Sequence, residues 1–237
     1  MSKAKTMGAC KLWLLTCSLV VVSIGQSSVA LAQDESPRPT PSTCTYSTYQ
    51  WSVEEKRAVN REQVSKEYSA VTDDERDPKE PRCTVCREDQ VELKVGELES
   101  VWVCWVYAEA LEKALRTIVD SGEFELEELE GYRVGRTRGK VVDGLRTEWS
   151  NHSFGTALDV NASSNGLYGN CDVDVLSEDS IEQCKLRMGG KWRPKKQPRV
   201  SIVKDGVVYK ALTEFWKWGG EIDGELKDIM HFSITGY

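Results

Sequence analysis

The sequence predicts an α+β domain over residues 98–237, with a small antiparallel sheet and flanking helices, preceded by a polar N-terminal extension. Three observations lead to this prediction. One long segment has apolar residues at helical spacing, and it is followed by several short apolar stretches separated by turn residues. The chain contains no internal repeat. A mixture of short helices and hairpins around one core is typical of the α+β class.

The first 32 residues have the pattern of an export signal. Three lysines precede an apolar run from Leu12 to Ile24, and Ala30-Leu31-Ala32 matches a signal peptidase site. We therefore expect cleavage after Ala32 and a secreted or periplasmic protein. The alternatives are a short anchor that stays attached and a lipoprotein acylated at Cys17, although Cys17 lacks the usual small residue before it. No later segment is long and apolar enough to span a membrane.

Charge and cysteine content narrow the class of protein further. The chain has 31 basic and 38 acidic residues, a formal net charge of -7, which argues against a nucleic-acid partner. Six of the eight cysteines lie after the signal, and an even number in an exported chain predicts disulfides. We expect Cys171 to pair with Cys184. Cys83 and Cys86 have the spacing of half a zinc site or of a redox motif, but the chain has no second Cys-x-x-Cys and no histidine nearby, so we expect structural disulfides there too.

Residues 33–97 form the polar extension. They begin with three prolines and several Ser and Thr, which are typical of a linker. Trp51 to Tyr68 is charged and is expected to be helical, and Asp73 to Pro81 is a charged loop bounded by proline. No residue of this segment suggests chemistry, so we interpret it as a disulfide-tethered extension.

The core is expected to begin near Leu98. Apolar residues from Val101 to Ile118 recur at helical spacing, and Gly122 follows as a stop signal. The remaining elements are short. They are strands at Tyr132–Val134 and Ala157–Asn161, a hairpin from Val200 to Tyr209 with an Asp-Gly turn, a short helix at Lys210–Trp216 and a final strand at Phe232–Thr235.

The chain contains only two histidines, and each is close to an acidic residue. His152 precedes Asp159 by seven residues, with Gly155 allowing the chain to bend between them. His231 lies far along the sequence, where it can close the same site. Catalytic zinc commonly takes three protein ligands and keeps one position for water. We therefore predict a zinc site formed by His152, Asp159 and His231.

Asp228 is the candidate for the general base. It lies three residues before His231, so one helical turn would place both side chains on the same face. From there its carboxylate could accept a proton from the attacking water and deliver it to the leaving amine. Arg136, with Arg138 as the alternative, is the candidate cation for charge that develops on the scissile carbonyl.

Two motifs resemble those of the zinc D-alanyl-D-alanine carboxypeptidase family, which also contains L-alanyl-D-glutamate endopeptidases. The first is Ser150-x-His152-x-x-Gly155-x-Ala157-x-Asp159. The second combines Trp216-Lys217-Trp218-Gly219-Gly220 with Asp228-x-x-His231-Phe232. The motifs occur in the order found in that family, and the resemblance extends over roughly residues 98–237.

The resemblance implies a zinc peptidase that cuts the stem peptides of bacterial peptidoglycan. It implies His152, Asp159 and His231 as zinc ligands and Asp228 as the base. Contacts with substrate are expected from Ser150, Trp218 and Gly219, and Arg136 is assigned to the family's upstream arginine. Dipeptidase-like members carry Glu at the base position, whereas Asp228 matches the endopeptidase-like members and favours an endopeptidase. The insert over residues 167–198 is expected to cover the substrate site.

Two other classes of protein are considered. One is a non-catalytic zinc-containing binding module of the cell envelope, a class that includes the hedgehog signalling domain of similar fold. The retention of Asp228 argues against it. The other is a disulfide-rich structural protein with incidental histidines, and the presence of both motifs argues against that. The scissile bond and the oligomeric state do not follow from the sequence.

Overall fold

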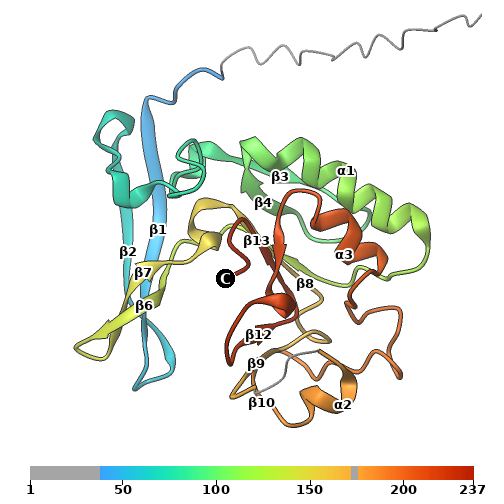
Figure 1. The fold of residues 1–237 in the computed structure, drawn as a ribbon. Helices are drawn as coiled ribbons and strands as arrows, with labels where there is room; N and C mark the ends of the chain where they lie inside the picture. Colours follow the sequence, from blue (N-terminus) through green and yellow to red (C-terminus); the bar gives the residue numbers. More distant parts are fainter. Residues whose placement is uncertain (1–37, 172–175) are drawn as a thin grey trace, which may run out of the picture. The chain divides into compact units, whose positions relative to one another are not determined.

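The computed structural model describes residues 38–171 and 176–237 (Figure 1). The predicted signal, with Cys10 and Cys17, lies outside the described residues. Residues Thr40–Tyr237 form one compact unit. Short strands in small, mainly antiparallel sheets alternate irregularly with a few helices, so the predicted α+β class is confirmed. No helix in the described ranges has the length and apolar character that a membrane crossing requires.

The sheet at the centre of the predicted core has the strand order β11-β13-β8-β5. Its members are β11 (Lys217–Trp218), β13 (His231–Ser233), β8 (Ala157–Val160) and β5 (Leu129–Glu130). β8 and β13 confirm, within one or two residues, the strands expected at 157–161 and 232–235. The prediction of a strand at Tyr132–Val134 was wrong, because that segment is irregular. The Tyr132 amide donates to Trp102 O and the Arg133 amide donates to His152 O.

Two helices pack against this sheet. α1 (Trp105–Ser121) follows β4 (Val101–Cys104), which pairs with β3 (Gln90–Leu93). Gly122 ends α1 in the left-handed conformation, with φ at 65°, which confirms the predicted stop. α3 is Val207–Leu212. Both helices contribute to the main core.

The hairpin predicted at 200–209 was wrong because α3 begins at Val207. Val208, Ala211 and Leu212 are buried, which is the i, i+3, i+4 pattern of a helix with one face in the core. Lys204 and Asp205 form the turn before it rather than a hairpin turn. The short helix expected at Lys210–Trp216 therefore exists, but it begins and ends a few residues earlier.

The polar N-terminal segment is largely folded. β1 (Thr43–Ser52) and β2 (Arg57–Glu67) form an antiparallel hairpin that joins β6 (Arg136–Val142) and β7 (Leu145–Trp149) in the order β2-β1-β6-β7. The helix expected at 51–68 was therefore wrong. The charged side chains that suggested a solvated helix instead cover a strand at the edge of a sheet, where charge discourages pairing with other chains.

Short helical turns and two disulfides complete the N-terminal segment. The turns are η1 (Tyr68–Ala70), η2 (Asp73–Glu75) and η3 (Arg87–Asp89). Cys44 pairs with Cys86, and Cys83 pairs with Cys104 at the start of α1. The structural role predicted for Cys83 and Cys86 is confirmed, and the second bond ties the N-terminal segment to the core.

Two strands of the insert form a small sheet with β12, in the order β10-β9-β12. β9 (Leu167–Gly169) pairs with both β10 (Lys185–Met188) and β12 (Lys227–Asp228), and the short helix α2 (Glu178–Ile181) lies between β9 and β10. Cys171 and Cys184 are joined, as predicted. Because β12 carries Asp228, the insert contributes directly to the position of the proposed base.

Candidate metal centre

The register between β8 and β13 brings two of the predicted ligands together. Asp159 and His231 are directly opposed residues of this antiparallel pair. Directly opposed side chains lie on the same face of a sheet, with Cβ atoms about 5 Å apart. His231 Nδ1 is 2.8 Å from Asp159 Oδ1. Residues separated by more than 70 positions thus meet because of strand pairing alone.

His152 reaches the same point from a loop. It lies in η4 (Asn151–Phe154), a turn that Gly155 ends with φ at 68°. A Cβ on Gly155 would come within 2.5 Å of Cys104 N, so glycine is needed for both conformation and space. His152 Nδ1 donates to Gly131 O at 2.7 Å, which leaves Nε2 as the acceptor that faces Asp159.

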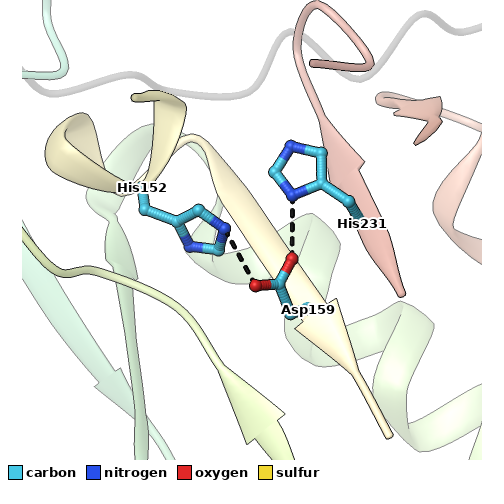
Figure 2. A group of neighbouring side chains, drawn as sticks. All are labelled: His152, Asp159 and His231. Carbon is cyan, nitrogen blue, oxygen red and sulfur yellow. Dashed lines mark hydrogen bonds and ion pairs between the residues drawn. The ribbon is translucent and has the colours of Figure 1, made fainter. Parts of the chain in front are cut away.

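The three side chains form a compact, buried group (Figure 2). Their candidate ligand atoms all lie within 4.8 Å of one another, and each residue is no more than 6% exposed. His152 Nε2 is 3.2 Å from Asp159 Oδ2 but makes no hydrogen bond within the described residues. A buried imidazole nitrogen that faces a carboxylate without a hydrogen bond is what a metal ligand requires. Two imidazoles and one carboxylate suit zinc and leave a coordination position open.

The electrostatics of the group also favour a cation. Burial lowers the pKa of His152 by more than the neighbouring Asp159 raises it, so this imidazole stays neutral. Burial alone would raise the pKa of Asp159, but the electrostatic interactions with His152 and His231 hold it well below its usual range. Burial likewise opposes protonation of His231, yet the hydrogen bond and charge of Asp159 raise its pKa. An ionised carboxylate between two imidazoles attracts either a proton or a metal ion.

Asp228 lies beside this group on β12. It is not part of the helical turn expected from its spacing: Ile229 and Met230 form a turn between β12 and β13. Burial raises the pKa of Asp228 to about 6. The charge of His231 lowers this pKa in part, and the charge of Asp159 raises it. The Oδ1 atom of Asp228 is buried and has no hydrogen-bond partner in the described part of the chain. The carboxyl can therefore take up and release a proton near neutral pH.

The arginine beside the metal group is Arg133, not Arg136. Arg133 Nη2 is 3.3 Å from Asp159 Oδ2, and Nε is 2.8 Å from Glu130 Oε1. Burial lowers the pKa of Arg133, but the charges of Asp159 and Glu130 and a hydrogen bond with Tyr49 outweigh this and raise it. This guanidinium is the cation closest to the predicted ligands in the contacts of the described residues.

The two arginines predicted for this role lie elsewhere. Arg136 Nη2 is 2.7 Å from Asp74 Oδ2, and its guanidinium stacks over the Trp149 ring. Arg138 Nη1 donates to Tyr237 O at 2.9 Å. Three arginines occur within six residues of sequence, and spacing alone does not distinguish them. What identifies Arg133 is the hydrogen bond from its amide to His152 O.

The predicted substrate-contacting residues are close to the metal group but differ in what they can offer. Gly219 lies against Asp228 and His231: a Cβ there would be 2.4 Å from Asp228 O and 3.2 Å from His231 Cβ. The Trp218 side chain is buried and donates from Nε1 to Ile229 O, so it supports the turn before His231. Ser150 precedes η4, and its buried Oγ has no hydrogen-bond partner among the described atoms.

The first motif is held in place by contacts with the N-terminal segment and with the last residues of the chain. The sequence did not suggest these contacts. Thr156 directly precedes β8, and its Oγ1 donates to Asp77 Oδ2 at 2.6 Å. Both residues are buried. Asn151 Nδ2 donates to Ser233 Oγ and Thr235 Oγ1 at 2.8 and 2.6 Å, linking η4 to β13. These contacts involve ordinary polar residues at no recognisable spacing.

Comparison with known proteins agrees with this geometry. Residues 144–234 match the model of a family described as D-alanyl-D-alanine carboxypeptidase. The matched segment contains both motifs, the three candidate ligands and Asp228, so a hydrolytic enzyme is indicated. No curated protein and no solved structure matches the chain significantly. Together with the three disulfides, the family match points to a location outside the cytoplasm.

Proposed function

We propose that this protein is an exported zinc peptidase that hydrolyses the stem peptides of bacterial peptidoglycan, as an L-alanyl-D-glutamate endopeptidase or a D,D-carboxypeptidase. The observation that carries the proposal is the buried His152–Asp159–His231 group with Asp228 beside it, inside a segment that matches the peptidase family. Zinc bound there would lower the pKa of a coordinated water to about 7 and polarise the scissile carbonyl.

Proton transfer and stabilisation of the developing negative charge are the roles of Asp228 and Arg133. Asp228 holds its proton with a pKa of about 6, so near neutral pH it is largely ionised and can accept one proton from water. The same carboxyl can then return that proton to the amine of the leaving group. Arg133, held by Asp159 and Glu130, supplies positive charge where negative charge develops on the carbonyl oxygen.

Asp228 also argues for an enzyme over a zinc-containing binding module. A buried carboxylate whose Oδ1 has no hydrogen-bond partner in the described chain is costly to maintain for stability alone. Such groups are concentrated at catalytic sites, where a shifted pKa is useful. Preference for the endopeptidase follows from Asp at this position, which is the choice of the endopeptidase-like members that the sequence resembles.

The test is turnover of purified muropeptides by the zinc-loaded full-length mature protein. Mass spectrometry of the products identifies the bond: release of D-alanine indicates carboxypeptidase activity, and a new D-glutamate amino terminus indicates endopeptidase activity. A chelator should abolish turnover, and zinc should restore it. Zinc binding without any hydrolysis of muropeptides or intact sacculi would support the binding module instead.

A further inference from the structure

A second hollow lies outside the metal centre, between the β1–β2 hairpin and the strands β6 and β7. Its volume is about 410 Å³, within the range of small-ligand sites. Three aromatic side chains line it: Tyr46, Tyr49 and Trp149. Carboxylate, amide, hydroxyl and guanidinium groups lie between them, including Glu62 and Arg136. We call this hollow the hairpin groove.

The hairpin is irregular where it lines the groove. Thr48 pairs with Glu62, but Gln50 pairs with Val59, so β2 has one extra residue opposite Tyr49. Asn60, in this bulge, has φ at 51°, a left-handed conformation that few residues other than glycine adopt. Its Nδ2 donates to Gln50 Oε1 at 2.9 Å. Bulges of this kind change the direction of side chains and are frequent beside binding sites.

Thr48, one of the residues that line the groove, has a hydroxyl whose hydrogen-bonding capacity is unused. Thr48 Oγ1 is buried and has no hydrogen-bond partner among the described residues. A hydroxyl can both donate and accept, and a buried one is normally satisfied. Rotation of the Thr48 side chain toward the groove would let a ligand with hydroxyl or amide groups provide the missing partner.

One short segment separates the hairpin groove from the metal centre. On the groove side, Tyr49 covers Gly135 so closely that a Cβ there would be 2.5 Å from the ring. On the metal side, the Gly135 amide donates to Ser153 Oγ at 3.1 Å, and the Arg133 amide donates to His152 O at 3.1 Å. Tyr49 also hydrogen-bonds to the Arg133 side chain. A polymer bound in the groove would therefore be separated from the metal centre by this segment, and a chain attached to the polymer could extend past it.

The chemistry of the lining indicates a sugar. Pyranose rings have apolar C–H faces and a rim of hydroxyl and amide groups, so they need aromatic surface together with many hydrogen-bonding groups. Tyr and Trp provide an apolar body with a polar end, and the carboxylates and amides provide acceptors and donors. The lining carries three carboxylates, Glu62, Asp74 and Glu75, and two cations, Lys66 and Arg136. The excess of negative charge disfavours a polyanion.

We propose that the hairpin groove binds the glycan part of the wall polymer, about one disaccharide of N-acetylated hexosamines, while the attached peptide extends to the metal centre. The inference rests on the proposed function, because it names the neighbouring part of the same substrate. It assigns a role to the N-terminal segment, which carries no residue of the metal group, and to Arg136, which lies in the groove instead of at the metal.

The test separates binding from hydrolysis. Calorimetric titration of the full mature protein with peptide-free glycan tetrasaccharide gives a dissociation constant that requires no turnover. Thr48→Val removes the unpartnered hydroxyl at nearly constant volume, and Asn60→Gly removes the amide while keeping the left-handed conformation accessible. Each should raise the dissociation constant about tenfold, the loss of one or two hydrogen bonds. Ser47→Ala, on the neighbouring exposed position of β1, is the matched control and should bind like the wild type.

Kinetics provide the second measurement. With peptide still attached to glycan strands, Thr48→Val and Asn60→Gly should raise KM severalfold and leave kcat unchanged. With free stem peptide, their kcat/KM should equal that of the wild type. Absence of saturable glycan binding, or equal affinity in both variants and the control, would overturn the inference. Competition by free stem peptide for the groove would do so as well, since it would identify a peptide site. Glycan binding without hydrolysis would contradict the proposed function, but the assignment of the hairpin groove to glycan binding would stand.

Discussion

Replacing Asp228 by Asn should separate catalysis from stability. The carboxyl has an ordinary pKa of 3.8 and a folded-state pKa of about 6, a difference of about two units. Each unit corresponds to about 1.4 kcal/mol, so ionised Asp228 costs the metal-free folded protein about 3 kcal/mol at neutral pH. Because the folded pKa is raised, this cost is absent below about pH 4, develops between about pH 4 and 6, and is complete above 6. The uncharged amide avoids it.

The variant should therefore unfold at higher urea concentration than the wild type at pH 7, with the difference shrinking toward pH 4. Both proteins are measured metal-free, by equilibrium denaturation. Muropeptide turnover by the zinc-loaded variant should fall by about 10²-fold or more, since the amide cannot accept the proton. In the wild type, kcat/KM should decline as the pH falls through the pKa of the base. Retained turnover would refute the role of Asp228, and lower stability at pH 7 would refute the account of its burial.

Three further outcomes are expected. The mature protein should carry about one zinc ion by elemental analysis, and His231→Ala should lose it; full occupancy in that variant would rule out the ligand set. Arg133→Lys should lower kcat/KM on free stem peptides by about 10²-fold, as loss of one oxyanion contact does. Arg136→Lys should change kcat/KM on the same peptides less than twofold, so the reverse order would restore Arg136 to the metal centre. Removing the Cys83–Cys104 bond by a double Ser substitution should lower unfolding free energy by about 3 kcal/mol for a separation of 21 residues, and unchanged denaturation curves would contradict this.

The grouping of His152, Asp159 and His231 could be predicted from sequence because histidine is rare in this chain. With only two histidines after the signal, each near an acidic residue, few sets of ligands were possible. The pairing of β8 with β13 then supplied the geometry. Arg133 could not be chosen in the same way. Arginine is common, and its place at Asp159 depends on an irregular segment held by the His152 carbonyl.

The fold was predicted best where burial gives a periodic pattern and worst where charge dominates. α1 has buried Leu111, Leu115 and Ile118 on one face, and its periodicity was visible. β2 has few apolar residues, so its charged sequence suggested a helix although strand pairing with β1 decides its conformation. Local propensity is a weak guide where tertiary pairing supplies the stabilisation.

The pairing of β12 with β9 limits how the insert could be shortened in a redesigned enzyme. Leu167 and Tyr168 hold Asp228 and Lys227 by main-chain pairing, and the Ile229 amide donates to Gly166 O at 3.2 Å. Replacing the stretch between β9 and β10 by a tight turn would keep this support. Excising the whole insert would leave the proposed base on an unpaired strand, where a displacement of 1 Å can cost 10²-fold in rate. Loop grafting for new specificity should therefore begin after Gly169.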